Sequence, residues 1–390
     1  MPKWNWLEKP ENNPSWSFIF RVIAKAVILF VVLNVLFALI VPMDALGRVS
    51  LYNNVLPGRE RLPYGDSPSL SYNVSLFNIP AMFASHEVSG GKVDDEFRVF
   101  LIGDSATWGW LLENGDTLAG IINAQNPTTD DGGRIVVYNL AYPSMTLTKD
   151  LLLLDYAMRY QPDLIIWPMT LKSFPHTTQF ADSSVQDKTL VLNNTERVRD
   201  LIETYNLDLD PNDGRFVEAD FMDNTIVGQR RNLADLLRLQ FYGFSWASTE
   251  IDQYMKGYEL RQSDFDEDTI YMGFSKDEPF TEDDLAFDVL AAGIEIAGDV
   301  PVLIINEPIF ITDGMNHELH YNSFYPCWAY DLYSDMLTEQ AENNNWIFLD
   351  LGDALPPDVF TDTPVHFTPD GAGQYTELVL EAIADILQNK

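Results

Sequence analysis

The sequence predicts an α/β protein built on a five-stranded parallel sheet, with one membrane-spanning helix before it. Three observations lead to this expectation. Short, apolar, β-branched segments recur along the chain, and segments with apolar residues at helical spacing separate them. Near the N-terminus, an 18-residue stretch from Ala26 to Met43 carries no charge. A strand that is covered by helices on both faces is apolar at every position, whereas a half-exposed strand alternates apolar and polar residues. The continuous apolar runs therefore indicate a parallel sheet.

Length and charge narrow the class of protein. The chain has 390 residues, of which 46% are hydrophobic, enough for one large or two small domains. Its formal net charge is -35, and the residues after position 42 carry -37, from 20 basic and 57 acidic side chains. Such a surface repels phosphates, so a nucleic-acid partner is not expected. A solvated acidic face, as on a secreted or a salt-adapted protein, explains the charge. The single cysteine, Cys327, can form no intrachain disulfide.

The apolar stretch is long enough to cross a bilayer, and it extends back to about Phe18 if Arg21 and Lys25 snorkel. A cleaved signal peptide is the alternative. The run is longer than a usual signal core and no small-x-small cleavage site follows it, which favours an uncleaved anchor. The basic residues on the two sides nearly balance, but Arg21 and Lys25 against Asp44 favour a cytoplasmic N-terminus. We therefore expect a single-pass protein of the cell membrane whose large domain is extracytoplasmic.

The elements follow in order after the anchor. Residues 44–93 are rich in Asn, Pro, Gly and Ser and are expected to form a stalk. The apolar runs predict fully buried strands at Arg98–Gly103, Arg134–Leu140, Leu164–Met169, Val300–Asn306 and Trp346–Leu351.

Helices are predicted between and after the strands. One follows Asp116, one covers residues 147–160, and one runs from Asp284 to Ala297, with the two aspartates as N-caps. The last helix has Thr368 as its N-cap and Pro369 at its first position.

About 130 residues separate the third and fourth strands, which is far more than a crossover needs. We expect an inserted lid over residues 176–298, between the two parts of a catalytic domain at 94–175 and 299–390. Its best-formed segment, Asn232–Ser248, is amphipathic and aromatic. That segment could cover the substrate cleft or lie on the membrane surface, and an ordinary core helix of a lid is the simpler interpretation.

Polar residues that can perform acyl transfer occur where predicted strands end. Gly103-Asp104-Ser105 follows the first strand, "NLAYPS" (139–144) follows the second, and Asp362 and His366 precede the last helix. Ligands of parallel sheets bind at the carboxyl ends of the strands. A serine needs a base within hydrogen-bond reach and an acceptor that orients the base, and all three residue types are present. A turn cap at Ser105 and a core histidine at His366 are the structural alternatives.

The order of these blocks, with "QPDLIIWPMT" leading out of the third strand, resembles the SGNH/GDSL hydrolase superfamily over about residues 94–172 and 299–387. The resemblance implies a flavodoxin-like three-layer αβα sandwich. It makes Ser105 the nucleophile and first oxyanion donor, His366 the base and Asp362 its orienting carboxylate. In the family the aspartate usually lies three residues before the histidine, where this chain has Thr363. A one-residue bulge before Pro364 can bring Asp362 to the imidazole. Otherwise a backbone carbonyl or the Thr363 hydroxyl would hold the imidazole less strongly.

The oxyanion hole departs further from the family pattern. The family commonly has a glycine in the second block and an asparagine in the third, where this chain has Ser144 and Lys172. The Ser144 backbone N–H can still donate, and Lys172 can replace the asparagine as a cationic donor or point to solvent. We also expect Asn139 and Asn306 to contribute to oxyanion or substrate binding, since each ends a strand at this edge. For Asn306 and Glu307 a buried turn is the alternative. Trp108 and Trp110 suit stacking on a sugar ring, although packing beneath a lid explains them as well.

The resemblance therefore implies a membrane-anchored serine esterase or O-acyltransferase, similar to anchored members that act on acylated extracellular glycans. Its expected partners are an acylated glycan or other ester, the membrane, and a membrane-bound acyltransferase that supplies acyl groups. No cofactor is expected, and no metal, because the pair His317 and His320 has no evident third ligand. Two alternatives remain: a catalytically silent glycan-binding or scaffolding domain, in which Asp362 does not reach His366, and a lipid esterase fed by the 232–248 helix.

Overall fold

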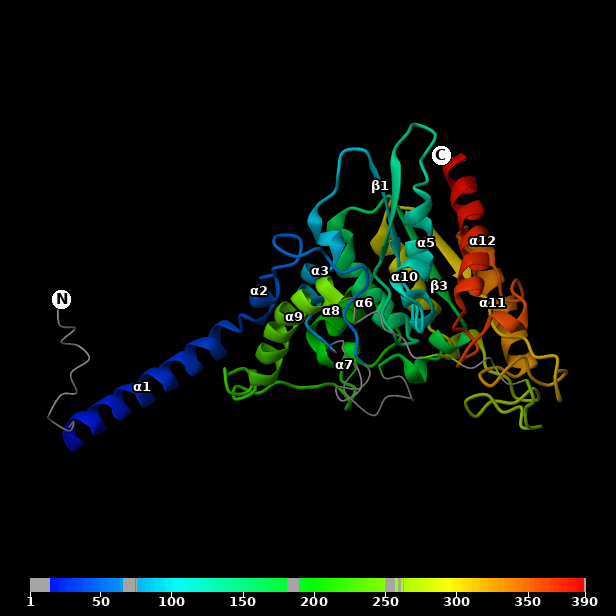
Figure 1. Cartoon of the computed structure of the whole chain (residues 1–390). Helices are drawn as coiled ribbons and strands as arrows, with labels where there is room; N and C mark the ends of the chain where they lie inside the picture. Colours follow the sequence, from blue (N-terminus) through cyan, green and yellow to red (C-terminus); the bar gives the residue numbers. More distant parts are fainter. Residues whose placement is uncertain are drawn as a thin grey trace. The chain divides into compact units, whose positions relative to one another are not determined.

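The structure, a computed structural model, describes residues 15–65, 74, 76–180, 189–249, 257–258, 261 and 263–388. The chain divides into two compact units. The first unit is Met1–Met43 with Glu218–Ala234, and the second is Asp44–Val217 with Asp235–Lys390. The second unit contains the sheet (Figure 1).

The sheet has five strands in the order β2-β1-β3-β4-β5, and all four neighbouring pairs are parallel. The strands are β1 (Glu96–Leu101), β2 (Arg134–Asn139), β3 (Leu164–Met169), β4 (Val302–Asn306) and β5 (Ile347–Asp350). The predicted α/β class, strand positions and parallel sheet are confirmed. The prediction of full burial is wrong for both edge strands: Ile347 of β5 is 40% exposed, and in β2 Arg134 is exposed and Val136 is half-buried. As an edge strand, β5 pairs only with β4, so part of it remains open to solvent.

Helices lie before, between and after the strands along the chain. They are α1 (Trp16–Ile40), α2 (Met43–Gly47), α3 (Ile79–Ser85), α4 (Ser105–Trp108), α5 (Leu118–Gln125), α6 (Leu147–Ala157), α7 (Leu190–Asn193), α8 (Thr195–Tyr205), α9 (Arg230–Thr249), α10 (Phe287–Ala297), α11 (Cys327–Asn344) and α12 (Pro369–Gln388). α5 packs against α12, and α6 packs against α10. Right-handed crossovers place α5 on the face of the sheet opposite α6, which gives the three layers. α10 lies within the predicted insert, yet it serves as the crossover helix between β3 and β4.

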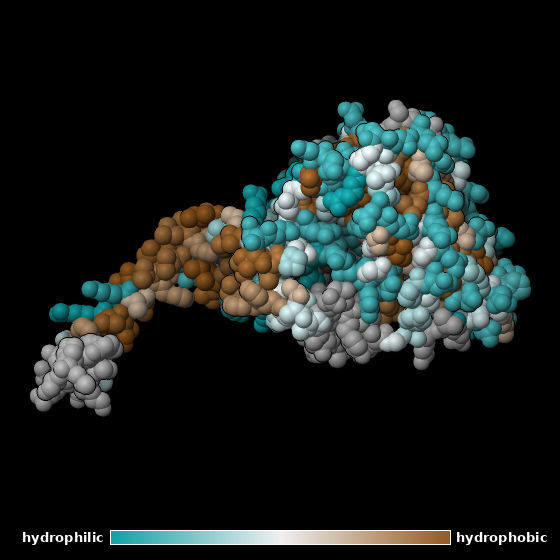
Figure 2. Space-filling model, turned by 45° about the horizontal axis from the view of Figure 1, so that its top comes forward, coloured by the Kyte–Doolittle hydropathy of each residue, from teal (hydrophilic) through white to brown (hydrophobic). Residues whose placement is uncertain are grey.

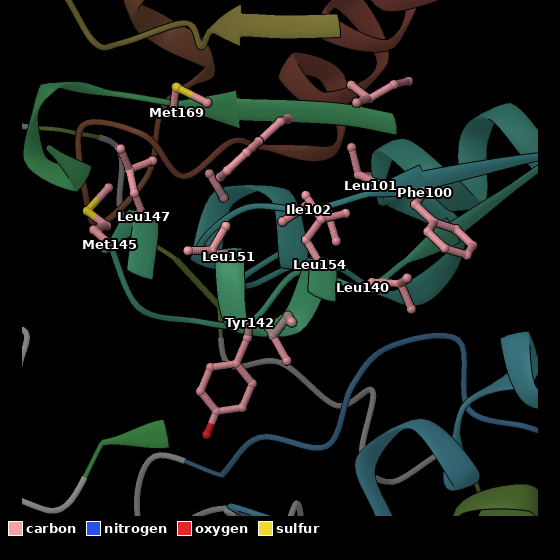
Figure 3. Close-up of a cluster of buried hydrophobic side chains, with 14 of the residues drawn as sticks. Phe100, Leu101, Ile102, Leu140, Tyr142, Met145, Leu147, Leu151, Leu154 and Met169 are labelled. Atoms are coloured by element: carbon pink, nitrogen blue, oxygen red, sulfur yellow. The ribbon is translucent and has the colours of Figure 1, made fainter. Parts of the chain in front are cut away.

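The buried face between β1 and α6 supports the edge where the site lies. Figure 3 shows Phe100 of β1 and Ile102, the residue after the strand, in one buried cluster with Leu147, Leu151 and Leu154 of α6. All five are at most 1% exposed. Because these apolar contacts fix both elements, the loops that leave them start from rigid positions.

The helix caps differ partly from the predicted ones. The N-cap of α5 is Thr117 rather than Asp116, and its hydroxyl accepts a hydrogen bond from the Gly120 N–H. Asp284 instead completes a capping box with Thr281 on the short turn before α10. Thr368 caps α12 as predicted, accepting from the Gly371 N–H. A threonine hydroxyl and the carboxylate of a neighbouring aspartate can both accept a hydrogen bond from the first N–H groups of a helix. Sequence alone therefore locates an N-cap only to within a residue or two.

The first unit is formed by α1 and residues Glu218–Ala234. α1 has 25 residues and is long and apolar enough to cross a membrane. Hydrophobic side chains cover most of its surface (Figure 2). Asn34 is an exception, being 7% exposed. Its amide donates to the Phe30 carbonyl, and its Oδ1 accepts from the Val227 N–H at 3.2 Å. The 218–234 segment therefore packs against the C-terminal part of α1.

Candidate active site

Ser105, His366 and Asp362 lie in one line of hydrogen bonds, although 261 residues separate the serine from the histidine. His366 Nε2 is 2.7 Å from Ser105 Oγ, and His366 Nδ1 is 2.8 Å from Asp362 Oδ1. The carboxylate can only accept, so it fixes the proton on Nδ1 and leaves Nε2 free to accept from the serine hydroxyl. The His366 side chain is 6% exposed and that of Asp362 is 44% exposed. This arrangement can activate a serine for attack on a carbonyl carbon.

The turn after β1 places Ser105 at the first position of α4. Asp104 is the N-cap, and its Oδ1 accepts from the Ala106 N–H at 2.8 Å. Gly103 has φ +156°, and a Cβ there would lie 2.6 Å from Thr107 Oγ1. Only glycine therefore allows the strand to turn this closely onto the helix. The Ser105 N–H, at the start of a helix, has no intrahelical partner and suits a developing oxyanion.

The loop before α12 brings Asp362 to the imidazole despite its spacing of four residues. Phe360 and Phe367 form an antiparallel bridge that closes the loop, and the Thr361 N–H donates to the His366 carbonyl at 2.8 Å. The Thr361 hydroxyl lies 3.2 Å from Asp362 Oδ1. Burial raises the pKa of Asp362, but the hydrogen bond and charge of His366 outweigh it and leave the pKa below its usual value.

The two tryptophans near the nucleophile have different environments. Trp108 is 2% exposed, donates from its indole N–H to the Leu62 carbonyl, and carries the Arg61 guanidinium over its ring. It is a core residue, so the prediction that it stacks on a sugar is wrong. Trp110 is half-buried, and its ring is stacked on His366 with 6.0 Å between centroids. Trp110 therefore both holds the imidazole and offers an aromatic face beside it.

Asn139 and Asn306 lie at strand ends, as predicted, but they do not serve as oxyanion or substrate ligands. The Asn139 amide donates to the carbonyls of Thr107 and Trp108, and its Oδ1 accepts from the Ala141 N–H. Asn139 is 1% exposed, and its hydrogen bonds fix the C-terminal end of α4 from the protein interior.

Asn306 is fully buried at the end of β4. Its amide donates to Asp350 Oδ1 at 2.7 Å, and its Oδ1 accepts from the Tyr330 hydroxyl at 3.0 Å. Both predictions failed because the side-chain amides of Asn139 and Asn306 are buried and form their hydrogen bonds inside the protein.

Ser144 and Lys172 lie on the loops that follow β2 and β3. The Tyr142 N–H donates to the Gly103 carbonyl at 3.0 Å, which joins the Ser144 loop to the nucleophile turn. The Ser144 N–H thus remains our proposed second oxyanion donor. The Lys172 ammonium lies 4.0 Å from the centroid of the Phe324 ring. Its contact is therefore with that ring, and an oxyanion role for Lys172 remains only a prediction.

Behind the nucleophile turn lies a group of buried ionisable side chains, the buried charge cluster, formed by Asp104, Lys149, Asp150 and Glu307. Each is at most 3% exposed. Lys149 Nζ donates to Asp150 Oδ1 at 2.5 Å and to the carbonyls of Gly103 at 2.6 Å and Tyr142 at 3.0 Å. The ammonium thereby ties the nucleophile turn to the loop after β2. Sequence reasoning missed this role of Lys149, although adjacent opposite charges in an otherwise apolar helix were a visible signal.

Burial dominates the electrostatics of this cluster. It raises the pKa of Asp150 to about 6, against the opposing effect of Lys149. It also raises the pKa of Asp104, which Lys149 and His366 oppose. The pKa of Glu307 lies well above its usual value, because of burial and then because of the carboxylates of Asp104 and Asp150. Both oxygens of Glu307 and Oδ2 of Asp104 have no hydrogen-bond partner among the described residues.

Replacing Glu307 with glutamine is expected to stabilise the protein at pH 8. The pKa of Glu307 is higher in the folded state than in the unfolded state, where it is near 4.5. The protein therefore has its full stability below the unfolded pKa and loses stability as the pH rises through the folded pKa. Glutamine has the same shape and cannot ionise. We expect the substitution to add about 1–2 kcal/mol at pH 8 and to have a vanishing effect towards pH 5, as measured by thermal unfolding across this range.

Glu381→Gln, at an exposed position of α12, is the matched control and is expected to change little at any pH. A Glu307→Gln variant that is less stable than the wild type at pH 8 would show that the charged carboxylate is the stabilising form.

No protein-family model matches the sequence, and no curated protein matches it. Solved structures do. The chain is similar to a member of the lipolytic G-D-S-L family from Veillonella parvula, at 11% identity and a TM-score of 0.34, covering 73% of this chain and 96% of that one. It is similar to the acetylxylan esterase Axe2 from Geobacillus stearothermophilus, solved as a catalytic mutant, at 13% identity and a TM-score of 0.34, covering 73% and 93%. It is also similar to Est24, a carbohydrate acetylesterase from Sinorhizobium meliloti, at 12% identity and a TM-score of 0.33, covering 74% and 99%.

The α/β architecture that the resemblance implies is confirmed, because the five-stranded sheet is parallel throughout. Because β1, β2 and β3 are parallel, the loops that follow them all lie at the carboxyl end of the sheet. The loop before α12 brings His366 to the same end.

Proposed function

We propose that this chain, whose sequence motifs resemble those of the SGNH/GDSL hydrolases, is a serine esterase or O-acyltransferase with Ser105 as nucleophile. The observation that supports it most directly is the position of His366, 2.7 Å from Ser105 Oγ and 2.8 Å from Asp362 Oδ1. A silent domain was expected to lack the contact between Asp362 and His366. The contact therefore favours the enzyme over the silent binding domain.

The reaction follows from the geometry. As Ser105 Oγ attacks the acyl carbon, His366 Nε2 takes the hydroxyl proton, and Asp362 stabilises the imidazolium that forms. The Ser105 N–H and the Ser144 N–H stabilise the oxyanion of the tetrahedral intermediate. His366 then gives the proton to the leaving alkoxide, which leaves an acyl-serine. Water resolves the acyl-serine in hydrolysis, and a sugar hydroxyl resolves it in transfer.

Acylated extracellular glycans are the proposed substrate class. Trp110, half-buried and stacked on His366, presents an aromatic face next to the nucleophile, and such faces suit the apolar side of a sugar ring. A membrane-bound acyltransferase that supplies the acyl group remains part of the proposal for the transfer reaction.

The test is active-site labelling of the protein with a fluorophosphonate probe, beside release of acetate from acetylated glycans. An activated serine at position 105 is expected to react, with the label found by peptide mapping on Ser105. A folded protein that neither takes up the label nor releases acetate would refute the enzymatic proposal and favour a glycan-binding domain.

We also propose that α1 is an uncleaved anchor with the large domain outside the cell. The contact between Asn34 and the Val227 N–H supports retention of the helix, because cleavage would remove a buried partner of residues 218–234. Membranes from expressing cells are expected to keep the protein through carbonate extraction at alkaline pH, and its intact mass is expected to include Trp16–Ile40. A soluble product that begins after Met43 would identify the segment as a signal peptide instead.

A further inference from the structure

A cavity of about 270 Å³ opens between the loops at the catalytic edge of the second unit. It is lined by Met145, Lys172, Thr178, Ile270, Tyr271, Met272, Ser323 and Phe324. We call it the Lys172 pocket. It is close to the lower size limit of small-molecule sites, so it fits one substituent or ring of a larger ligand rather than a long chain.

The Lys172 pocket adjoins the catalytic residues. The Arg261 guanidinium donates one hydrogen bond to the Asp362 carbonyl and another to Ser323 Oγ, which lines the pocket. Met145 and Lys172 follow β2 and β3, so they lie at the same sheet edge as Ser105. A ligand with an ester at Ser105 can therefore place a neighbouring group in the pocket.

The charge of the pocket is unusual for this protein. Its lining includes one cation and no carboxylate, although the chain has 59 acidic residues. In the described part of the chain, no acidic side chain forms an ion pair with Lys172. The ammonium lies instead over the Phe324 ring, 4.0 Å from its centroid. A cation–π contact holds the charge in place and leaves N–H donors available to an anion.

The loop that carries Lys172 is fixed. The Lys172 N–H donates to the Tyr325 hydroxyl at 3.3 Å, and that hydroxyl also lies 2.6 Å from Thr170 Oγ1. Tyr325 is fully buried. The ammonium thus projects from a rigid base, which lowers the entropic cost of binding a ligand.

A strained hairpin forms another part of the pocket lining. Tyr271 and Phe274 exchange both backbone hydrogen bonds, at 3.0 and 2.9 Å, across a turn formed by Met272 and Gly273. Met272 has φ 51°, a left-handed conformation that costs a non-glycine residue about 1 kcal/mol. The turn brings Ile270 and Met272, which are 54% and 46% exposed, to the pocket wall. Apolar side chains facing a single cation suit a sugar ring that bears a carboxylate.

We propose that the Lys172 pocket binds the carboxylate of a uronic acid, so that the substrates of Ser105 are acylated acidic glycans. This inference rests on the proposed esterase function. It assigns Lys172 to the recognition of the substrate, in place of the oxyanion role predicted for it.

The experiment compares kcat/KM for two matched esters, an acetylated methyl glucuronoside and the corresponding acetylated methyl glucoside. The wild type is expected to prefer the glucuronoside by at least about 10-fold, and the preference is expected to fall as salt is raised from 50 to 500 mM, because salt screens the Lys172–carboxylate attraction. Lys172→Met is expected to bring the ratio of the two kcat/KM values close to 1, while Lys172→Arg keeps part of it. Lys276→Met, at an exposed position outside the pocket, is the control and should leave the ratio unchanged.

Two results would overturn the inference. One is a wild type without preference for the glucuronoside. The other is an equal fall of kcat/KM on both esters in Lys172→Met, which is the signature of an oxyanion donor. If neither ester is cleaved and no label reaches Ser105, the proposed function has failed. Calorimetric binding of the two glycosides to the wild type and to Lys172→Met then decides the pocket separately, with loss of glucuronoside binding expected in the variant and equal binding overturning the inference.

Discussion

Replacing His366 with alanine is expected to lower kcat for ester hydrolysis by about 10⁴-fold or more, with KM changing far less. The imidazole is the only group in the described part of the chain that forms a hydrogen bond with Ser105 Oγ. Without it the hydroxyl has no base at neutral pH. Ser105→Ala is expected to have an effect of the same size, and the double variant should be no worse than either single one, because residues that act as a unit are not additive.

Steady-state kinetics on a small acetyl ester, with circular dichroism to confirm folding, measures this. His317→Ala is the control, because the His317 side chain is 62% exposed and lies outside the site. A folded His366→Ala protein that keeps activity within 10-fold of the wild type would show that the Ser105–His366–Asp362 arrangement is structural rather than catalytic.

Replacing Lys149 with methionine is expected to destabilise the protein by about 3–5 kcal/mol. The substitution leaves the buried Asp150 carboxylate without its cation, and it removes the ammonium that donates to the carbonyls of Gly103 and Tyr142. Because these carbonyls belong to the nucleophile turn and the loop after β2, kcat should fall together with stability. Urea unfolding at pH 7.5 and ester hydrolysis measure the two effects.

The chain offers a matched control for this experiment. Lys92 and Asp163 form an ion pair of the same length, 2.5 Å, but their side chains are 26% and 32% exposed. Lys92→Met is expected to cost about 0–1 kcal/mol. The double variant Lys149→Met/Asp150→Asn should recover part of the lost stability, since it removes the uncompensated charge. Equal costs for the two lysine substitutions would mean that burial of Lys149 has no energetic consequence.

Much of the fold could be predicted from the sequence. Strands buried on both faces must be apolar over their whole length, so their positions are visible as runs such as Leu164–Met169. The edge strands β2 and β5 were the exceptions, because residue type does not reveal which strand has a neighbour on one side only. Likewise, Thr368 was found as a cap, while Thr117 was missed beside Asp116, since adjacent acceptors compete for the same N–H groups.

The residues of the candidate site also fall into those that the sequence predicts correctly and those that it does not. Ser105, Asp362 and His366 were predicted because glycine turns, strand ends and a helix start leave marks in the sequence, and the structure brings the three together. Asn139 and Asn306 had the right type and place, but whether an amide faces a ligand or the interior depends on its neighbours in space. Those neighbours, such as Tyr330, are distant in sequence.

The sequence by itself thus determined the parallel sheet, the apolar N-terminal helix and the residue types at the nucleophile turn, because each depends on local pattern and on composition. The tertiary structure alone decided that Asp362 reaches His366 across four residues, that Lys149 contacts the nucleophile turn, and that the Lys172 ammonium lies over the Phe324 ring. The physical reason is that hydrogen bonds and charges act over a few ångströms in space, and only the packed chain fixes which side chains come within that distance.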